Sequence, residues 1–148
     1  MSRGSRLMSV LLAAVLLSLT SNAQRVDTKS LRDILAEQGF TGQLDGNIKV
    51  RFARLGVMKC NTAILQVYYY TGEETHPPGR AIHFSQRLIF IEGRTYLGQY
   101  VVSDRPVLVK PDSLGFPYSK GDGNTIQCDQ EGLPKLARLD GHYLDFEQ

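Results

Sequence analysis

The chain has 148 residues, of which 42% are hydrophobic, 22% charged and 9% aromatic. This is the composition of an ordinary globular protein, and it excludes collagen-like, coiled-coil and strongly disordered classes. The 17 basic and 15 acidic residues are interspersed along the chain, so no clustered positive face predicts binding to nucleic acid.

The first 23 residues have the three parts of a secretory signal. Arg3 and Arg6 precede an apolar run from Leu7 to Leu19, and small residues follow at the positions that a signal peptidase reads. We expect cleavage after Ala23, which leaves a single domain from Gln24 to Gln148, periplasmic or secreted and without a membrane span. The alternative is a membrane anchor, but a spanning helix needs roughly 20 apolar residues and this run has about thirteen.

Cys60 and Cys128 are the two cysteines, and both lie in the part expected to be exported, where thiols are oxidised. We expect one disulfide, which the chain-entropy model values at roughly 4 kcal/mol for a closed loop of about 70 residues. A metal site would need ligands at shorter spacing, and a catalytic thiol would leave the second cysteine unexplained. The sequence therefore predicts no metal and no cofactor.

One short amphipathic helix is predicted at the start of the exported part. Leu31, Ile34 and Leu35 recur at helical spacing after Asp27, and Gly39 stands where the helix would end. The apolar stripe is narrow, so the helix should lie against a sheet.

Beyond Gln43, β-branched and aromatic residues separated by Gly, Pro and Asp predict strands. The predicted strands are Asn47 to Leu55, Val57 to Tyr70, a hairpin of Ala81 to Glu92 with Arg94 to Ser103, and short strands at Val107 to Val109, Thr125 to Cys128 and His142 to Phe146. Leu133 to Leu139 predicts one or two turns of helix. The expected fold is α+β, a short N-terminal helix packed on a curved antiparallel sheet with one disulfide; a small β-barrel or sandwich is the alternative.

The hairpin contains the candidate binding site. A tight turn at Glu92–Gly93 would place Ile91 opposite Arg94 and Ser85 opposite Tyr100. One face would then be apolar and consist of Ile82, Phe84, Leu88, Phe90, Leu97 and Val101. The other face would consist of His83, Ser85, Arg87, Tyr96 and Tyr100, together with Ile89, Ile91 and Val102. Donors beside aromatic rings suit a ligand or a partner, and a solvated outer face is the alternative interpretation.

Three other patterns have simpler interpretations. His83 and Ser85 suggest a base and a nucleophile, but neither a Gly-x-Ser-x-Gly elbow nor an orienting acid accompanies them. The segments Glu73 to His76 and Lys120 to Asn124 contain residue types that bind cations, yet solvated turns explain them better. The rings of Tyr68 to Tyr70 predict either a contact surface or core.

The sequence supports three function hypotheses. The first is a small exported soluble binding protein for an envelope or extracellular protein or glycan, with binding residues His83, Ser85, Arg87, Tyr96 and Tyr100. The alternatives are a secreted or periplasmic hydrolase acting on envelope material, and a structural assembly subunit that pairs by an exposed strand edge. No organised catalytic set is recognisable, so we assign no catalytic residue and favour a protein that is not an enzyme.

Overall fold

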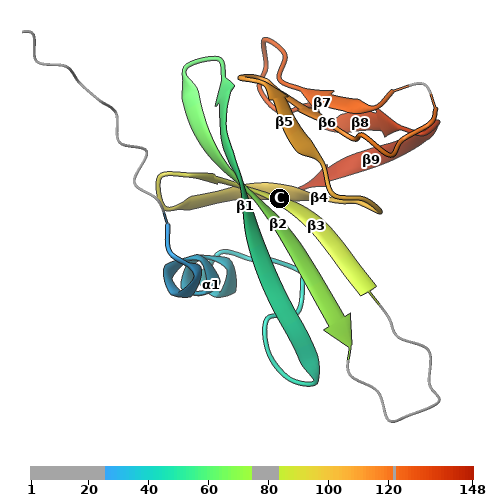
Figure 1. The fold of residues 1–148 in the computed structure, drawn as a ribbon. Coiled ribbons are helices and arrows are strands. Elements are labelled where there is room, and N and C mark those ends of the chain that lie inside the picture. Colours follow the sequence, from blue (N-terminus) through green and yellow to red (C-terminus); the bar gives the residue numbers. More distant parts are fainter. Residues whose placement is uncertain (1–25, 75–83, 122) are drawn as a thin grey trace, which may run out of the picture.

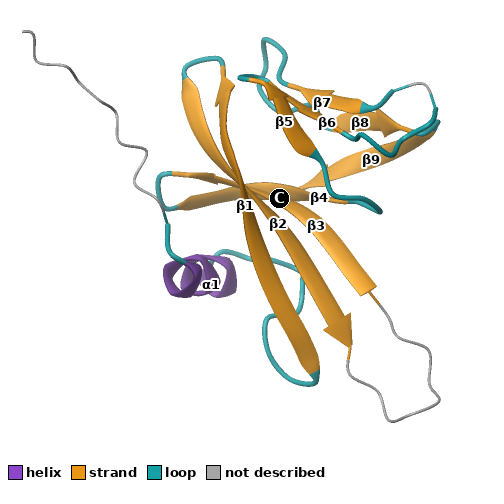
Figure 2. Cartoon of the chain, viewed as in Figure 1, coloured by secondary structure: helices purple, strands orange, loops and turns teal. Residues whose placement is uncertain are grey.

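The computed structural model describes residues 26–74, 84–121 and 123–148. These residues form one α-helix and nine β-strands (Figure 1). In chain order the elements are α1 (Thr28–Glu37), β1 (Ile48–Cys60), β2 (Ala63–Glu74), β3 (Phe84–Glu92), β4 (Thr95–Val101), β5 (Val107–Lys110), β6 (Ser113–Gly115), β7 (Thr125–Gln127), β8 (Leu136–Leu139) and β9 (His142–Glu147). The predicted antiparallel β-structure with one short helix is confirmed (Figure 2). No helix in the described ranges is long and apolar enough to cross a membrane.

Helix α1 begins where its sequence signal predicts. The Asp27 carboxylate accepts hydrogen bonds from the backbone N–H groups of Lys29 and Ser30 at 2.9 and 3.0 Å, which caps the N-terminus of the helix. The buried face consists of Leu31, Ile34 and Leu35. Gly39 follows with a φ of +85°, a conformation that glycine adopts without strain, so the chain leaves the helix direction there.

β1 and β2 form one long hairpin whose limits differ from the predicted ones. We expected a break at Gly56, but β1 passes through it to Cys60 with a β-bulge just before the glycine. The chain reverses at Asn61, whose φ of 57° lies in the left-handed region that asparagine tolerates. β2 then runs to Glu74 instead of ending at Tyr70, because β1 supplies backbone partners along its whole length.

β3 and β4 form the predicted hairpin with a different turn. Glu92 pairs with Thr95, so the turn residues are Gly93 and Arg94 rather than Glu92 and Gly93. Gly93 has a φ of +59°, which suits the tight reversal. The turn is therefore one residue later than predicted, and every cross-strand pair of the hairpin changes with it.

A bulge changes the register of this hairpin a second time. Ile91 pairs with Tyr96, whereas the preceding residue, Phe90, pairs with Gly98. Leu97 is the additional residue on β4, and such an insertion moves the side chains beyond it to the other face of the sheet.

The predicted pairing of Ser85 with Tyr100 is wrong for this reason. Ser85 pairs with Gly72 of β2, and Tyr100 pairs with Leu88. Tyr96 and Tyr100 consequently lie in different hydrophobic clusters rather than on one shared face.

Hydrophobic clusters cover both faces of the larger sheet. That sheet has the strand order β1-β2-β3-β4-β9-β8, and a second sheet has the order β5-β6-β7. Leu88 and Phe90 of β3 share a cluster with Leu114 of β6. Ile89 and Ile91 share the other cluster with the buried residues of α1. Because successive side chains of a strand alternate, one face of β3 belongs to the first cluster and the other face to the second.

The predicted division of the hairpin into a core face and an outer face is therefore wrong. Ile89 and Ile91, predicted on the outer face, are fully buried. Phe84 and Val101, predicted to pack in the core, are 63% and 44% exposed. The prediction assumed one solvated face, which is common in antiparallel sheets, whereas the central part of β3 is buried on both sides.

The C-terminal part contains more strand than predicted. The helical turns expected at Leu133 to Leu139 are absent, because Leu136–Leu139 is β8 and pairs with β9. Ala137 and Leu139 point into the core between exposed neighbours, a period of two that is typical of a strand. β6 lies between the predicted strands at Val107 to Val109 and Thr125 to Cys128, where we expected no strand.

The predicted disulfide between Cys60 and Cys128 is confirmed, with the two Cα atoms 5.4 Å apart. It joins the end of β1 to the residue after β7. Beside it, the Lys59 N–H donates to the Pro111 carbonyl oxygen at 2.6 Å. The second sheet is thus attached to β1 by a covalent bond and a backbone hydrogen bond.

Candidate functional site

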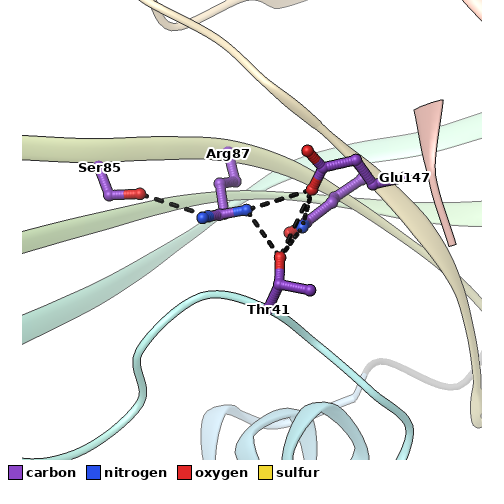
Figure 3. A network of polar contacts seen from close by, with 5 residues as sticks. Thr41, Ser85, Arg87 and Glu147 are labelled. Carbon is purple, nitrogen blue, oxygen red and sulfur yellow. Dashed lines mark hydrogen bonds and ion pairs between the residues drawn. The ribbon is translucent and has the colours of Figure 1, made fainter. Parts of the chain in front are cut away.

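A cluster of polar side chains surrounds Arg87 of β3 (Figure 3). The Arg87 Nε donates to the Ser85 hydroxyl oxygen at 3.3 Å, and Nη1 donates to the Thr41 hydroxyl oxygen at 3.1 Å. Nη1 also forms an ion pair with Glu147 Oε2 at 3.5 Å. We call Thr41, Ser85, Arg87, Gln99 and Glu147 the Arg87 cluster.

Gln99 is the buried member of this cluster. Its side chain has no exposed surface, and Nε2 donates to Thr41 Oγ1 and to Glu147 Oε2, both at 2.7 Å. The Thr41 hydroxyl donates to the same carboxylate oxygen at 3.4 Å. Donors from Arg87, Gln99 and Thr41 therefore converge on one oxygen of Glu147. The second amide atom, Gln99 Oε1, is buried and has no hydrogen-bond partner among the described residues.

The loop after α1 is fastened to the sheet on both sides of Thr41. Gln38 Nε2 donates to the Arg94 carbonyl oxygen at 3.0 Å, and Gln38 Oε1 accepts from the Tyr96 N–H at 2.8 Å. Further along the loop, the Tyr70 hydroxyl donates to the Gln43 carbonyl oxygen at 2.6 Å. These bonds fasten the loop to β2 and to the start of β4.

Aromatic rings lie beside Arg87 on the same face. Phe40 makes edge-to-face contacts with Tyr70 and Tyr96, at centroid distances of 5.3 and 6.1 Å. The Arg87 guanidinium lies 5.8 Å from the centroid of the Phe40 ring, within cation–π range, and its side chain is 16% exposed. Burial raises the pKa of Tyr96 to about 12 and raises that of Tyr70 as well, although the nearby Arg87 opposes both shifts. Both phenols are therefore neutral near pH 7.

Only part of the predicted binding set lies together. Ser85 and Arg87 are in direct contact in the Arg87 cluster. Tyr96 is on the same face but is 8% exposed, behind Phe40. His83 lies outside the described residues.

Tyr100 is separated from the other predicted site residues. It is fully buried in the cluster on the opposite face, between Phe90 and Phe146, and its hydroxyl donates to the Pro134 carbonyl oxygen. Burial raises its pKa far above the ordinary value for tyrosine. The rings of Tyr68 to Tyr70 are buried too, which favours the core interpretation of those residues.

The sequence interpretation missed Thr41, Gln99, Glu147 and Phe40. Thr41 and Glu147 are separated by 106 residues, and Gln99 and Glu147 by 48, so no local spacing connects them. One signal in the sequence could have pointed to Glu147. Side chains alternate along β9, so Glu147 lies on the same face of that strand as Tyr143 and Asp145.

The structure describes the other polar patterns of the sequence only in part. Ser85 Oγ accepts from Arg87, and His83, with which it was weighed as a nucleophile and base and set aside, is not among the described residues. Of the loop predicted at Glu73 to His76, the glutamates end β2 and the other two residues are not described. In the described ranges, no group of three or more His, Cys, Asp and Glu side chains is placed to hold a metal ion.

Comparison of the chain with protein-family models, with curated proteins and with solved structures finds no match in any of the three.

Proposed function

We propose that this chain is a small exported soluble binding protein, which contacts a protein or glycan partner through the surface around the Arg87 cluster. One observation carries the proposal: Thr41, Ser85 and Glu147 contact one partly exposed guanidinium, and the buried Gln99 of β4 holds Thr41 and Glu147 in place. A surface that is held in one geometry before binding loses little conformational entropy when the partner arrives. Arginine is also among the residues that contribute most to binding at protein interfaces.

The exposed groups around the cluster are chemically mixed. Val101 pairs with Arg87 across the strands, so the two side chains share a face, and Val101 is 44% exposed. The Glu147 side chain is 44% exposed, and Thr41 is exposed as well. A partner would meet a cation, a carboxylate, hydroxyl groups and an apolar side chain within one surface.

In this proposal Ser85 and Arg87 are contact residues, and His83, which directly precedes β3, remains a candidate contact residue. Tyr96 and Tyr100 support the surface from within, because both are buried. The proposal includes the expected architecture, in which the helix rests on a curved antiparallel sheet. The hydrogen bond from Arg87 to Thr41, in the loop after α1, supports this placement. Export is supported by the signal-like residues 1–23 and by the disulfide.

Capture of a partner from the exported fractions of the host tests the proposal. The purified disulfide-bonded protein and its Arg87→Ala and Arg138→Ala variants are immobilised in parallel; Arg138 is an exposed arginine of β8 and serves as the matched control. We expect the unaltered protein and Arg138→Ala to retain the same partner and Arg87→Ala to lose it. Arg87→Lys should bind more weakly than the unaltered protein, because lysine keeps the charge and loses the planar fork of donors.

Circular dichroism of each variant separates loss of binding from loss of folding. If Arg87→Ala fails to fold, the folded Arg87→Lys variant decides the question. Retention of the partner by both variants, or no specific partner for the unaltered protein, would contradict the proposal.

A further inference from the structure

The outer edge of β1 is open along much of its length. β1 is the terminal strand of the six-stranded sheet and pairs with β2 from Ile48 to Cys60 (Figure 1). On its other side, the backbone hydrogen bond to a described residue is the one from Lys59 to Pro111, near the end of the strand. Residues 48–55 therefore present outward N–H and C=O groups without a backbone partner in the described part of the chain, a form of edge that a further strand can join.

Other parts of the sheet are less accessible to an added strand. The hydrophobic clusters cover both faces of its centre. The opposite edge strand, β8, has four residues and lies near β7, where the Asp140 N–H donates to the Gly123 carbonyl oxygen at 3.1 Å. β1 has 13 residues and is the longest strand in the described ranges, so it offers the longest edge.

The positive charge of β1 favours an acidic partner. Lys49, Arg51, Arg54 and Lys59 are all exposed, and the strand has no acidic residue. None of the four forms an ion pair within 4.0 Å of a described carboxylate. Two antiparallel copies of this edge would bring like charges together, which disfavours a second copy of the chain as the occupant. Carboxylates on an added strand would instead compensate these cations.

A recess lies beside the edge on the face that α1 occupies. Phe52 and Arg54 of β1 line a pocket of about 240 Å³ together with Tyr68 of β2 and residues 26–28 at the start of α1. Alternate side chains of an added strand fall on this face, because Phe52 and Arg54 do so on β1. The pocket offers the Phe52 ring, the Arg54 guanidinium and the Asp27 carboxylate to one such side chain.

We propose that residues 48–55 of β1 accept an extended acidic segment of another protein, which adds to the sheet as a further strand. Backbone hydrogen bonds supply binding that does not depend on sequence, the exposed cations of β1 select acidic segments, and the pocket accommodates one side chain of the added strand. This site goes beyond the proposed function, because it uses different residues from the Arg87 cluster and a different mode of recognition.

Fluorescence anisotropy with synthetic peptides on the purified disulfide-bonded protein tests the inference. The probe is an eight-residue peptide that alternates glutamate with valine. One control replaces every glutamate by lysine, and two others carry N-methyl groups on alternate backbone amides, one set in each phase. We expect the acidic peptide to bind, the lysine peptide not to bind, and N-methylation in at least one phase to weaken binding by roughly tenfold or more, since it removes the backbone donors.

Two further measurements locate the site. Arg51→Glu should weaken binding of the acidic peptide by about tenfold. Arg138→Glu on β8 makes the same charge change away from the edge and should have little effect on that binding. Amide chemical shifts and hydrogen-exchange protection should change mainly in residues 48–55. Arg87→Ala should bind the acidic peptide as the unaltered protein does, so failure of this inference and failure of the proposed function give different results.

Three results would overturn the inference. If both N-methylated peptides bind as tightly as the unmodified acidic peptide, charge alone attracts the probe. Spectral changes outside β1 would place the site elsewhere. Self-association of the protein in sedimentation, accompanied by hydrogen-exchange protection of residues 48–55 without any peptide, would show that a second copy occupies the edge.

Discussion

Replacement of Tyr100 by alanine distinguishes a core residue from a contact residue. Tyr100 is fully buried, and its ring lies 5.8 Å from that of Phe90 and 4.9 Å from that of Phe146, measured between centroids. Its hydroxyl donates to the Pro134 carbonyl oxygen. The sequence alone placed Tyr100 in a binding face, where the same replacement would leave stability almost unchanged.

The structure predicts a large loss of stability instead. Removing a buried aromatic ring costs about 3–5 kcal/mol of unfolding free energy, because apolar surface is no longer buried and a cavity remains. At about 4 °C per kcal/mol for a domain of this size, the melting temperature should fall by roughly 12–20 °C. Tyr100→Phe keeps the ring and removes only the donor to Pro134, so it should cost about 1–2 kcal/mol.

Urea denaturation followed by far-ultraviolet circular dichroism measures these differences. Tyr143→Ala is the matched control, because Tyr143 is 65% exposed; its effect should stay within about 0.5 kcal/mol. If Tyr100→Ala is as stable as Tyr143→Ala, the burial of Tyr100 and the register that produces it are wrong.

Two other predictions concern the backbone and pH. At Gly98, where φ is +146°, an added Cβ would overlap the backbone oxygen of Glu147, so Gly98→Ala should separate β9 from β4. At Gly93, φ is +59° and the space around an added Cβ is open. Gly98→Ala should therefore lower the melting temperature more than Gly93→Ala, and equal melting temperatures of the two variants would refute this. Hydrogen bonds from the backbone and side chain of Ser30 lower the pKa of Asp27 from its ordinary value of 3.8, so this carboxylate stabilises the fold above that pH and loses the effect as the pH falls through the lowered pKa. The melting-temperature difference between the unaltered protein and Asp27→Asn should therefore narrow below pH 3.8, and a difference that stays constant there would contradict the capping role of the charge.

The sequence by itself determined the features that depend on near neighbours. Asp27, the spacing of the buried leucines and isoleucine, and Gly39 predicted α1, because capping and amphipathic periodicity act over a few residues. The disulfide followed from the presence of two cysteines in a segment expected to be exported. Most strands were also predicted, because β-branched and aromatic residues mark them locally.

Only the tertiary structure decided which side chains meet. A turn displaced by one residue and a bulge at Leu97 set the register of the hairpin, and a shift of one residue moves side chains to the other face. Tyr96 and Tyr100 were separated in this way, although their spacing of four residues placed them together in a regular strand. The Arg87 cluster likewise required Thr41 and Glu147, which are 106 residues apart, to meet over β3. Such contacts depend on how the loop after α1 and β9 pack against the sheet, and no local pattern of residues specifies that packing.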